Sequence, residues 1–240
     1  MNKLFILAGA SGAGKSTLLN WSVKEGYCNA AVKYSERKIF NTVDDISTVE
    51  DINDSQLQCD IIYSMYGNRY GFSSQKIRDQ LKEGNAILVT NDKRTIQELK
   101  IIFLQQVVVI YVVSDINKSL LRQIYIKRHG LPSIENEKGS LLEKIRNAEK
   151  MILQDDWESF IQYVEIINDK IDDIFLQEEE FRLRLDSIKY QENFLSSDLF
   201  KYDYLIFNLY SNGMQSKHVM GSAFEQLEKI INREMEDKNG

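Results

Sequence analysis

Residues 9–16, with the sequence GASGAGKS, constrain this chain more than any other stretch. They follow a short apolar run, residues 3–8, and precede a segment with helical spacing, so a strand, a tight loop and a helix must come in that order. The residues fit the pattern GxxxxGK[ST] at every fixed position. Its glycines let the backbone curl until successive N–H groups point at one anion. The sequence therefore predicts a phosphate-binding loop.

The motif also predicts what each residue type does. Lys15 is expected to reach the β- and γ-phosphates of ATP, and the Ser16 hydroxyl to be a ligand of Mg²⁺. ATP and Mg²⁺ are therefore the expected cofactors. The residues expected to contact the nucleotide in this segment are Gly9, Ala10, Ser11, Gly12, Ala13, Gly14, Lys15, Ser16 and Thr17.

Composition excludes several classes of protein. A chain of 240 residues can bury one core, and the absence of a Pro/Gly/Ser-rich linker predicts a single domain over 1–240. A net charge of −6 does not favour nucleic-acid binding. No apolar run is long enough to span a membrane. Two distant cysteines, Cys28 and Cys59, indicate a reducing compartment, and we expect a cytoplasmic location.

Strand and helix patterns alternate along the chain, which predicts an α/β fold with three layers, α/β/α, around a parallel sheet. The expected strands cover 3–8, 29–34, 85–92, 106–113 and 203–208. The expected helices cover 14–24, 73–84, 93–103, 114–128 and 216–236, with a loop at 129–139 and helical spacing from 140 to about 195.

The loop alone does not choose among kinases, GTPases and ATPases. A switch GTPase would carry a DxxG motif between the loop and an NKxD motif. The sequence has no NKxD, its DxxG match at 237–240 lies far from the loop, and no convincing hhhhDE strand supports an AAA-type ATPase. Of the three classes, kinases of small molecules are therefore the expected one.

Four stretches carry a resemblance, namely LFILAGASGAGKSTLL, YGNRYGFSSQKI, EGNAILV and YDYLIFN. In this order and spacing they resemble the guanylate kinase family over about residues 1–150 and 200–236. The resemblance implies a core at 1–34, 74–127 and 200–236, an acceptor lobe at 35–73 and a lid at 128–146 that closes over both substrates. A helical insertion occupies 150–199.

The resemblance also implies residue roles. Arg128 matches the first of the lid arginines that serve the transferred phosphate. Lys144 stands where the family has a further arginine, with Arg146 two residues on, and Asn208 ends a motif near the nucleotide. The acceptor would meet Lys33, Tyr34, Arg37, Tyr70, Gly71, Ser73, Asn91 and Asp92.

The acceptor side departs from the family pattern. Lys33 stands where the family has serine, Phe40 where it has a second arginine, and Phe72 where it has a hydroxyl. The guanine-reading carboxylate falls at Ile61, with Asp60 beside it, and Asn91 replaces an aspartate. A nucleoside monophosphate is the first expectation, with weaker selectivity for GMP. Two alternatives stay open, a kinase of a sugar phosphate such as ribose 1,5-bisphosphate and a non-catalytic binding module.

The insertion has its own pattern. Apolar residues recur at steps of three and four between 157 and 185, and residues 155–186 hold eleven acidic and three basic side chains. This pattern predicts a helix that either packs on its own kinase body or mediates a homodimer or another protein contact.

Overall fold

The computed structural model describes residues 1–36, 49–52, 59–65, 67–117, 120–121, 134–153, 161, 164, 179, 181–186, 188, 202–209 and 217–236. Its larger sheet is parallel, with β1 (Leu4–Ala8) at the centre. The strand order is β2 (Asn29–Ala30), β7 (Ala86–Val89), β1, β8 (Val107–Val113) and β9 (Tyr204–Phe207). The predicted α/β class with a parallel sheet is confirmed.

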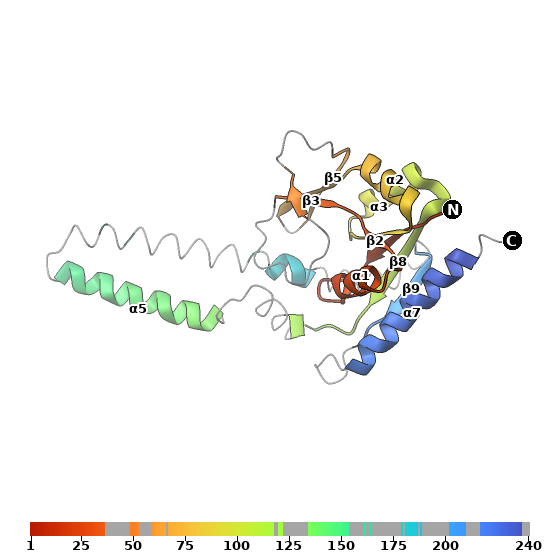
Figure 1. Cartoon of the computed structure of the whole chain (residues 1–240). Helices are drawn as coiled ribbons and strands as arrows, with labels where there is room; N and C mark the ends of the chain where they lie inside the picture. The colour runs from red at the N-terminus through yellow and green to blue at the C-terminus, as the bar shows by residue number, and fades with distance from the viewer. Residues whose placement is uncertain are drawn as a thin grey trace.

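Helices cover both faces of this sheet (Figure 1). Successive side chains of β1 enter two different apolar clusters, and all are buried, as expected for a parallel strand covered on both sides. One face is covered by α1 (Lys15–Lys24) and α7 (Lys217–Glu236). The other is covered by α2 (Ser74–Glu83) and α3 (Lys93–Phe103). This arrangement gives the three predicted layers.

A smaller sheet has the strand order β4 (Val49–Asp51), β3 (Lys33–Ser35), β6 (Asn68–Phe72) and β5 (Ile61–Met65). The prediction of one strand over 29–34 is wrong, because the chain leaves the larger sheet after Ala31 and enters the smaller one at Lys33. The smaller sheet lies in the predicted acceptor lobe, and its inner residues join the cluster under α2 and α3.

Two predictions after β8 also need correction. Residues 114–117 are not helical, and the turn that follows starts at Asn117, whose side chain accepts from Leu120 N at 2.9 Å. The predicted loop over 129–139 is wrong, because α5 (Ile134–Leu153) begins inside it and takes up the predicted lid from 134 onwards. Helix-favouring neighbours outweigh the cost of about 1 kcal/mol that Gly139 brings to a helix interior.

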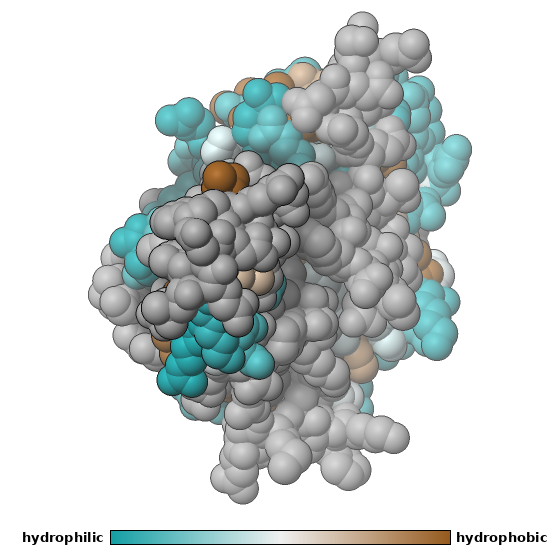
Figure 2. All heavy atoms as spheres, turned by 90° about the vertical axis from the view of Figure 1, so that its left-hand side faces the viewer, coloured by the Kyte–Doolittle hydropathy of each residue, from teal (hydrophilic) through white to brown (hydrophobic). Residues whose placement is uncertain are grey.

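The α5 helix projects away from the α/β body (Figure 1). Figure 2 views the molecule from that side, where the coloured residues are mostly hydrophilic and apolar ones stand singly. Leu142 and Ile145 are 58% and 38% exposed on α5. Most of the predicted helix at 155–186 lies outside the described residues.

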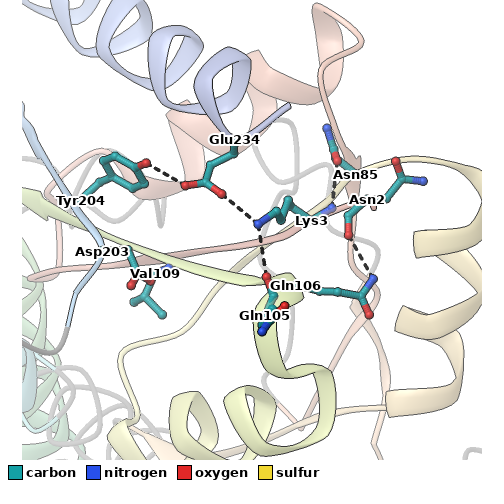
Figure 3. Close-up of polar contacts among 9 residues, drawn as sticks. All are labelled: Asn2, Lys3, Asn85, Gln105, Gln106, Val109, Asp203, Tyr204 and Glu234. Carbon is teal, nitrogen blue, oxygen red and sulfur yellow. Dashed lines mark hydrogen bonds and ion pairs between the residues drawn. The ribbon is translucent and has the colours of Figure 1, made fainter. Parts of the chain in front are cut away.

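A polar network joins α7 to the amino ends of the central strands (Figure 3). Glu234 accepts from the Tyr204 hydroxyl at 2.7 Å and pairs with Lys3 at 3.0 Å. Lys3 Nζ also donates to the carbonyl oxygen of Gln105 in η1 (Leu104–Gln106). Asp203 accepts from Val109 N at 2.7 Å and so fixes β9 against β8. These contacts hold together the amino ends of the strands, and the glycine loop lies at the opposite, carboxyl end of β1.

Candidate active site

Residues 9–16 join the carboxyl end of β1 to α1. Their three glycines have φ angles of 137° at Gly9, 83° at Gly12 and 92° at Gly14, which residues with a Cβ atom rarely adopt. Gly9 has a second reason to lack a side chain, because a Cβ there would lie 2.4 Å from the Val112 carbonyl oxygen. The segment therefore folds into the tight loop that the motif predicts.

The start of α1 suits an anion. Gly14 is the N-cap and offers no side-chain cap, and the first turn carries no acidic residue. The N–H groups of that turn and the positive end of the helix therefore face the loop. Lys15 Nζ donates to the carbonyl oxygens of Gly9 at 2.7 Å and Ala10 at 2.6 Å, so its ammonium lies over the loop. Ser16 is half-buried beside it, and Thr17 is exposed.

Two asparagines, both predicted as site residues, hold the loop from strands on opposite sides of β1. Asn91, just after β7, accepts from Gly9 N at 2.7 Å. Asn208, just after β9, donates through Nδ2 to the Ala13 carbonyl oxygen at 2.9 Å. The Asn208 side chain is fully buried, and its Oδ1 has no hydrogen-bond partner among the described residues. A buried oxygen left open beside a phosphate loop fits a site that binds a further hydrogen-bonding group.

Arg184 reaches the loop from a distant part of the sequence and was not predicted. Its Nη1 donates to Ser11 Oγ at 3.0 Å, and both side chains are buried, 9% and 7% exposed. The helical residues around it pack on the loop, in a cluster that contains Ala10, Ile116, Leu120 and Leu121 with Phe181, Leu185 and Ile188. Arg184 lies three residues after Phe181 and four before Ile188. It therefore shares the apolar face of a helix, which is the signal that could have identified it.

The predicted lid cations are placed differently. Lys144 and Arg146 lie on α5, half-buried and exposed respectively, and α5 projects away from the loop (Figure 1). The structure does not bring these two side chains to the phosphate loop. Arg128 lies outside the described residues. Of the cations after residue 113 that the structure describes, Arg184 is the one with a hydrogen bond to the loop.

Lys33 is the acceptor-side cation that approaches the loop. Its Nζ lies 4.5 Å from the centroid of the Tyr70 ring. A cavity of about 40 Å³ between α1 and the smaller sheet is lined by Ser16, Leu19, Ala31, Lys33, Phe72, Leu88 and Val89. The magnesium-ligand candidate and the acceptor-side lysine thus line one cavity.

Other predicted acceptor residues have roles within the fold. Tyr34 is 1% exposed, and Gly71 has no room for a Cβ atom, which would lie 2.9 Å from Cys59 Sγ. Ser73 caps α2 by accepting from Lys76 N. Gly71 and Ser73 lie in the predicted lobe and Tyr34 lies directly before it, and their contact with an acceptor stays a prediction.

Asp92 caps α3, and its Oδ2 accepts from Thr95 N at 2.8 Å and Thr95 Oγ1 at 2.9 Å. Its contact with an acceptor also stays a prediction. Arg37 lies outside the described residues.

The described residues offer little for other chemistries. No cluster of three or more His, Cys, Asp or Glu side chains among them could hold a metal ion. Burial raises the pKa of the Cys28 thiol to about 11, so that thiol stays protonated at neutral pH. None of the described helices is both long and apolar enough to cross a membrane.

Comparisons with known proteins give two results. No known family matches the sequence. Among solved structures, the alignment with a guanylate kinase from Anaplasma phagocytophilum covers 97% of this chain and 86% of the guanylate kinase chain. The sequence identity is 15% and the TM-score is 0.49. A similarity of this size does not assign an activity.

Proposed function

We propose that this chain transfers the γ-phosphate of ATP, with Mg²⁺, to a small phosphate ester, as guanylate kinases do. The acceptor is a nucleoside monophosphate or a sugar phosphate. The observation that supports this most is the placement of Ser16 and Lys33 around one cavity, next to a loop of left-handed glycines over which Lys15 lies. A nucleotide on the loop and a phosphate ester on the smaller sheet would meet there.

In the proposed reaction, an oxygen of the acceptor phosphate forms a bond to the γ-phosphorus as the bond from that phosphorus to the ADP oxygen breaks. Phosphoryl transfer asks mainly for positioning and for positive charge. The loop N–H groups hold the phosphates, Lys15 supplies charge at the β- and γ-phosphates, and Ser16 would hold Mg²⁺. Arg184, at the same loop, is placed to add a second cation.

The test is ADP formation with a panel of acceptors, comparing Lys15→Ala with the wild type. We expect a loss of roughly 10²-fold or more, as when a group that stabilises transition-state charge is removed. The matched control is Lys24→Ala, at the exposed last turn of the same helix, which should keep wild-type turnover.

Both variants should melt within a few degrees of the wild type. A folded Lys15→Ala protein with normal turnover would contradict the assignment. ATP binding without ADP formation for any acceptor would instead support the non-catalytic alternative.

A further inference from the structure

The peptide group between Ala13 and Gly14, where the glycine loop enters α1, has one of its two polar groups held by a side chain. Asn208 Nδ2 donates to the Ala13 carbonyl oxygen at 2.9 Å. The N–H of Gly14 donates to no residue that the structure describes. The C=O and N–H of a planar trans peptide point in opposite directions. The bond to Asn208 therefore turns the Gly14 N–H away from Asn208 and leaves it for a ligand of the loop.

Glycine at position 14 makes this orientation easy to reverse. Its φ is 92°, and a residue without a Cβ atom adopts positive and negative φ about equally well. Rotation about the two backbone bonds that flank the peptide group therefore exchanges the directions of C=O and N–H at little steric cost. In the reversed peptide group, the Ala13 carbonyl oxygen would point where the Gly14 N–H points now.

The neighbouring backbone hydrogen bonds do not select the orientation. Ala13 N donates to Ala10 O at 3.2 Å, and Leu18 N donates to Gly14 O at 3.0 Å. These groups belong to the peptides before and after the one between Ala13 and Gly14. Within the part of the chain that the structure describes, Asn208 is therefore the residue whose hydrogen bond favours the present orientation.

Asn208 is well fixed for this role. Its backbone N–H donates to Val113 O at 2.9 Å, at the end of β8, and its side chain is fully buried. Its Oδ1 has no hydrogen-bond partner among the described residues. A buried oxygen without a partner lowers stability, so an apolar side chain of similar size would serve the packing about as well. What the amide adds to the site is its bond to Ala13.

We propose that Asn208 is a positioning residue of the phosphate loop, which keeps the Gly14 N–H turned towards the phosphates of a bound nucleotide. The proposal rests on the proposed function, because it takes the ligand of the loop to be a nucleotide. An N–H group makes a charge-assisted hydrogen bond with a phosphate oxygen, whereas a carbonyl oxygen in its place repels the phosphate. Loss of the Asn208 amide therefore weakens the binding of the phosphates and not that of the base.

The first experiment observes the Gly14 N–H by NMR. Two alanine–glycine pairs occur in the sequence, Ala8–Gly9 and Ala13–Gly14. A protein labelled with ¹³C at the alanine carbonyl and ¹⁵N in glycine therefore gives two signals in a spectrum that selects directly bonded ¹³C and ¹⁵N atoms. Ala13→Ser removes one of them and so identifies the signal of Gly14. On addition of ADP with Mg²⁺, we expect the Gly14 proton signal to move downfield. The Gly9 N–H, which donates to Asn91 Oδ1, should move less.

The second experiment measures ADP binding by calorimetry. Asn208→Leu replaces the amide with an apolar side chain of similar size. We expect it to weaken ADP by about 10-fold or more, since hydrogen bonds to charged groups are strong. Adenosine, which has no phosphate, should bind the variant and the wild type within about 3-fold of each other. A change that only loosened the fold would weaken both ligands.

The matched control is Asn85→Leu. Asn85 is also buried, at 6% exposed, and its Oδ1 accepts from Lys3 N at 2.9 Å at the amino ends of the strands. The control removes an equally buried amide from a hydrogen bond to the backbone, far from the glycine loop. We expect it to change the affinity for ADP by less than about 3-fold, because the loop keeps its orientation.

An ADP affinity that Asn208→Leu leaves unchanged, or that both leucine variants lower equally, would overturn the proposal. So would a Gly14 signal that does not respond to ADP in the wild type, a result that does not depend on whether either variant folds. In each of these cases, ADP formation that depends on Lys15 would leave the proposed function standing. A Gly14 response to ADP that Asn208→Leu abolishes, without ADP formation for any acceptor, would support the role of Asn208 and contradict phosphotransfer.

Discussion

Arg184 is fixed at the glycine loop both by its hydrogen bond to Ser11 and by its helix neighbours. The apolar side chains around it pack on Ala10, so the guanidinium has little freedom to move away. Arginine keeps its charge even when buried, and its planar group matches phosphate oxygens. If the proposed phosphate transfer takes place at this loop, a guanidinium in this position would stabilise the negative charge that develops on the phosphate.

We therefore expect Arg184→Met to lower kcat by about 10²-fold, with a smaller change in KM, because the cation acts mainly on charge that grows in the transition state. Ser11→Ala removes the hydrogen bond and keeps the cation, so its turnover should fall far less. The measurement is steady-state ADP formation, with thermal melting to verify folding.

Arg182→Met is the matched control, since Arg182 is 67% exposed and pairs with Glu179 at 2.6 Å on the surface. If Arg184→Met and Arg182→Met have the same kcat, Arg184 does not act on the phosphate and serves only to hold its helix at the loop.

The conformation of the glycine loop could be predicted from the sequence, because its motif is local. Lys15, Ser16 and the three glycines are adjacent in the chain, so a pattern can identify them. Arg184 and Ser11 are 173 residues apart, and no pattern links them. The family resemblance instead pointed to Lys144 and Arg146, which lie on the projecting α5.

The carboxyl-terminal part of α7 is tied to the sheet by Glu234. Burial alone would raise the pKa of this carboxyl, but hydrogen bonds from Tyr204 and Lys3 outweigh burial and hold the pKa below its ordinary value. A carboxyl with a lowered folded-state pKa stabilises the fold above its unfolded pKa, about 4.3 for Glu. This contribution is lost as pH falls through the folded-state value.

We expect Glu234→Gln to lower the free energy of unfolding by about 1 kcal/mol at pH 7. The difference from the wild type should shrink towards zero near pH 3, as measured by urea unfolding at each pH. Glu236→Gln, at an exposed position two residues further on, is the control and should change little. A difference for Glu234→Gln that does not depend on pH would contradict the ion-pair explanation.

Among the helices and strands, those with clear start and stop signals were predicted well. The α2 and α3 helices match the expected ranges 73–84 and 93–103, with side-chain caps at Ser73 and Asp92, and β8 matches its run of β-branched residues. The prediction of one strand over 29–34 was wrong because periodicity shows that a segment is extended but not which sheet it joins. The start of α5 was missed because the expected loop extended to Gly139, whereas this glycine lies within the helix.

The long segment between residues 121 and 181 starts and ends at one place in the molecule. Leu121 and Phe181 belong to the same cluster beside Ala10, and α5, which lies between them in the sequence, projects away from the body. The entropic cost of closing a loop grows only with the logarithm of its length. A shorter connection between Leu121 and Phe181 should therefore change the free energy of unfolding little.

We expect replacement of residues 131–178 by a short Gly/Ser linker to leave the melting temperature within about 5 °C of the wild type, because the segment bridges two points of one cluster. Light scattering on both proteins tests whether the segment mediates a homodimer, and the double variant Ile167→Asp with Ile171→Asp tests the predicted helix directly. A variant that fails to fold would show that the segment packs on the body as part of its core.

The ties on the glycine loop also set an order in which the molecule can be completed during synthesis. The loop is made within the first sixteen residues, whereas Asn208, which holds Ala13, is made 195 residues after its partner. The α7 residues that cover one face of β1 are made after Asn208. A nascent chain therefore carries its glycine loop and one uncovered face of β1 until α7 is made, and the loop becomes held on both sides only once Asn208 is made.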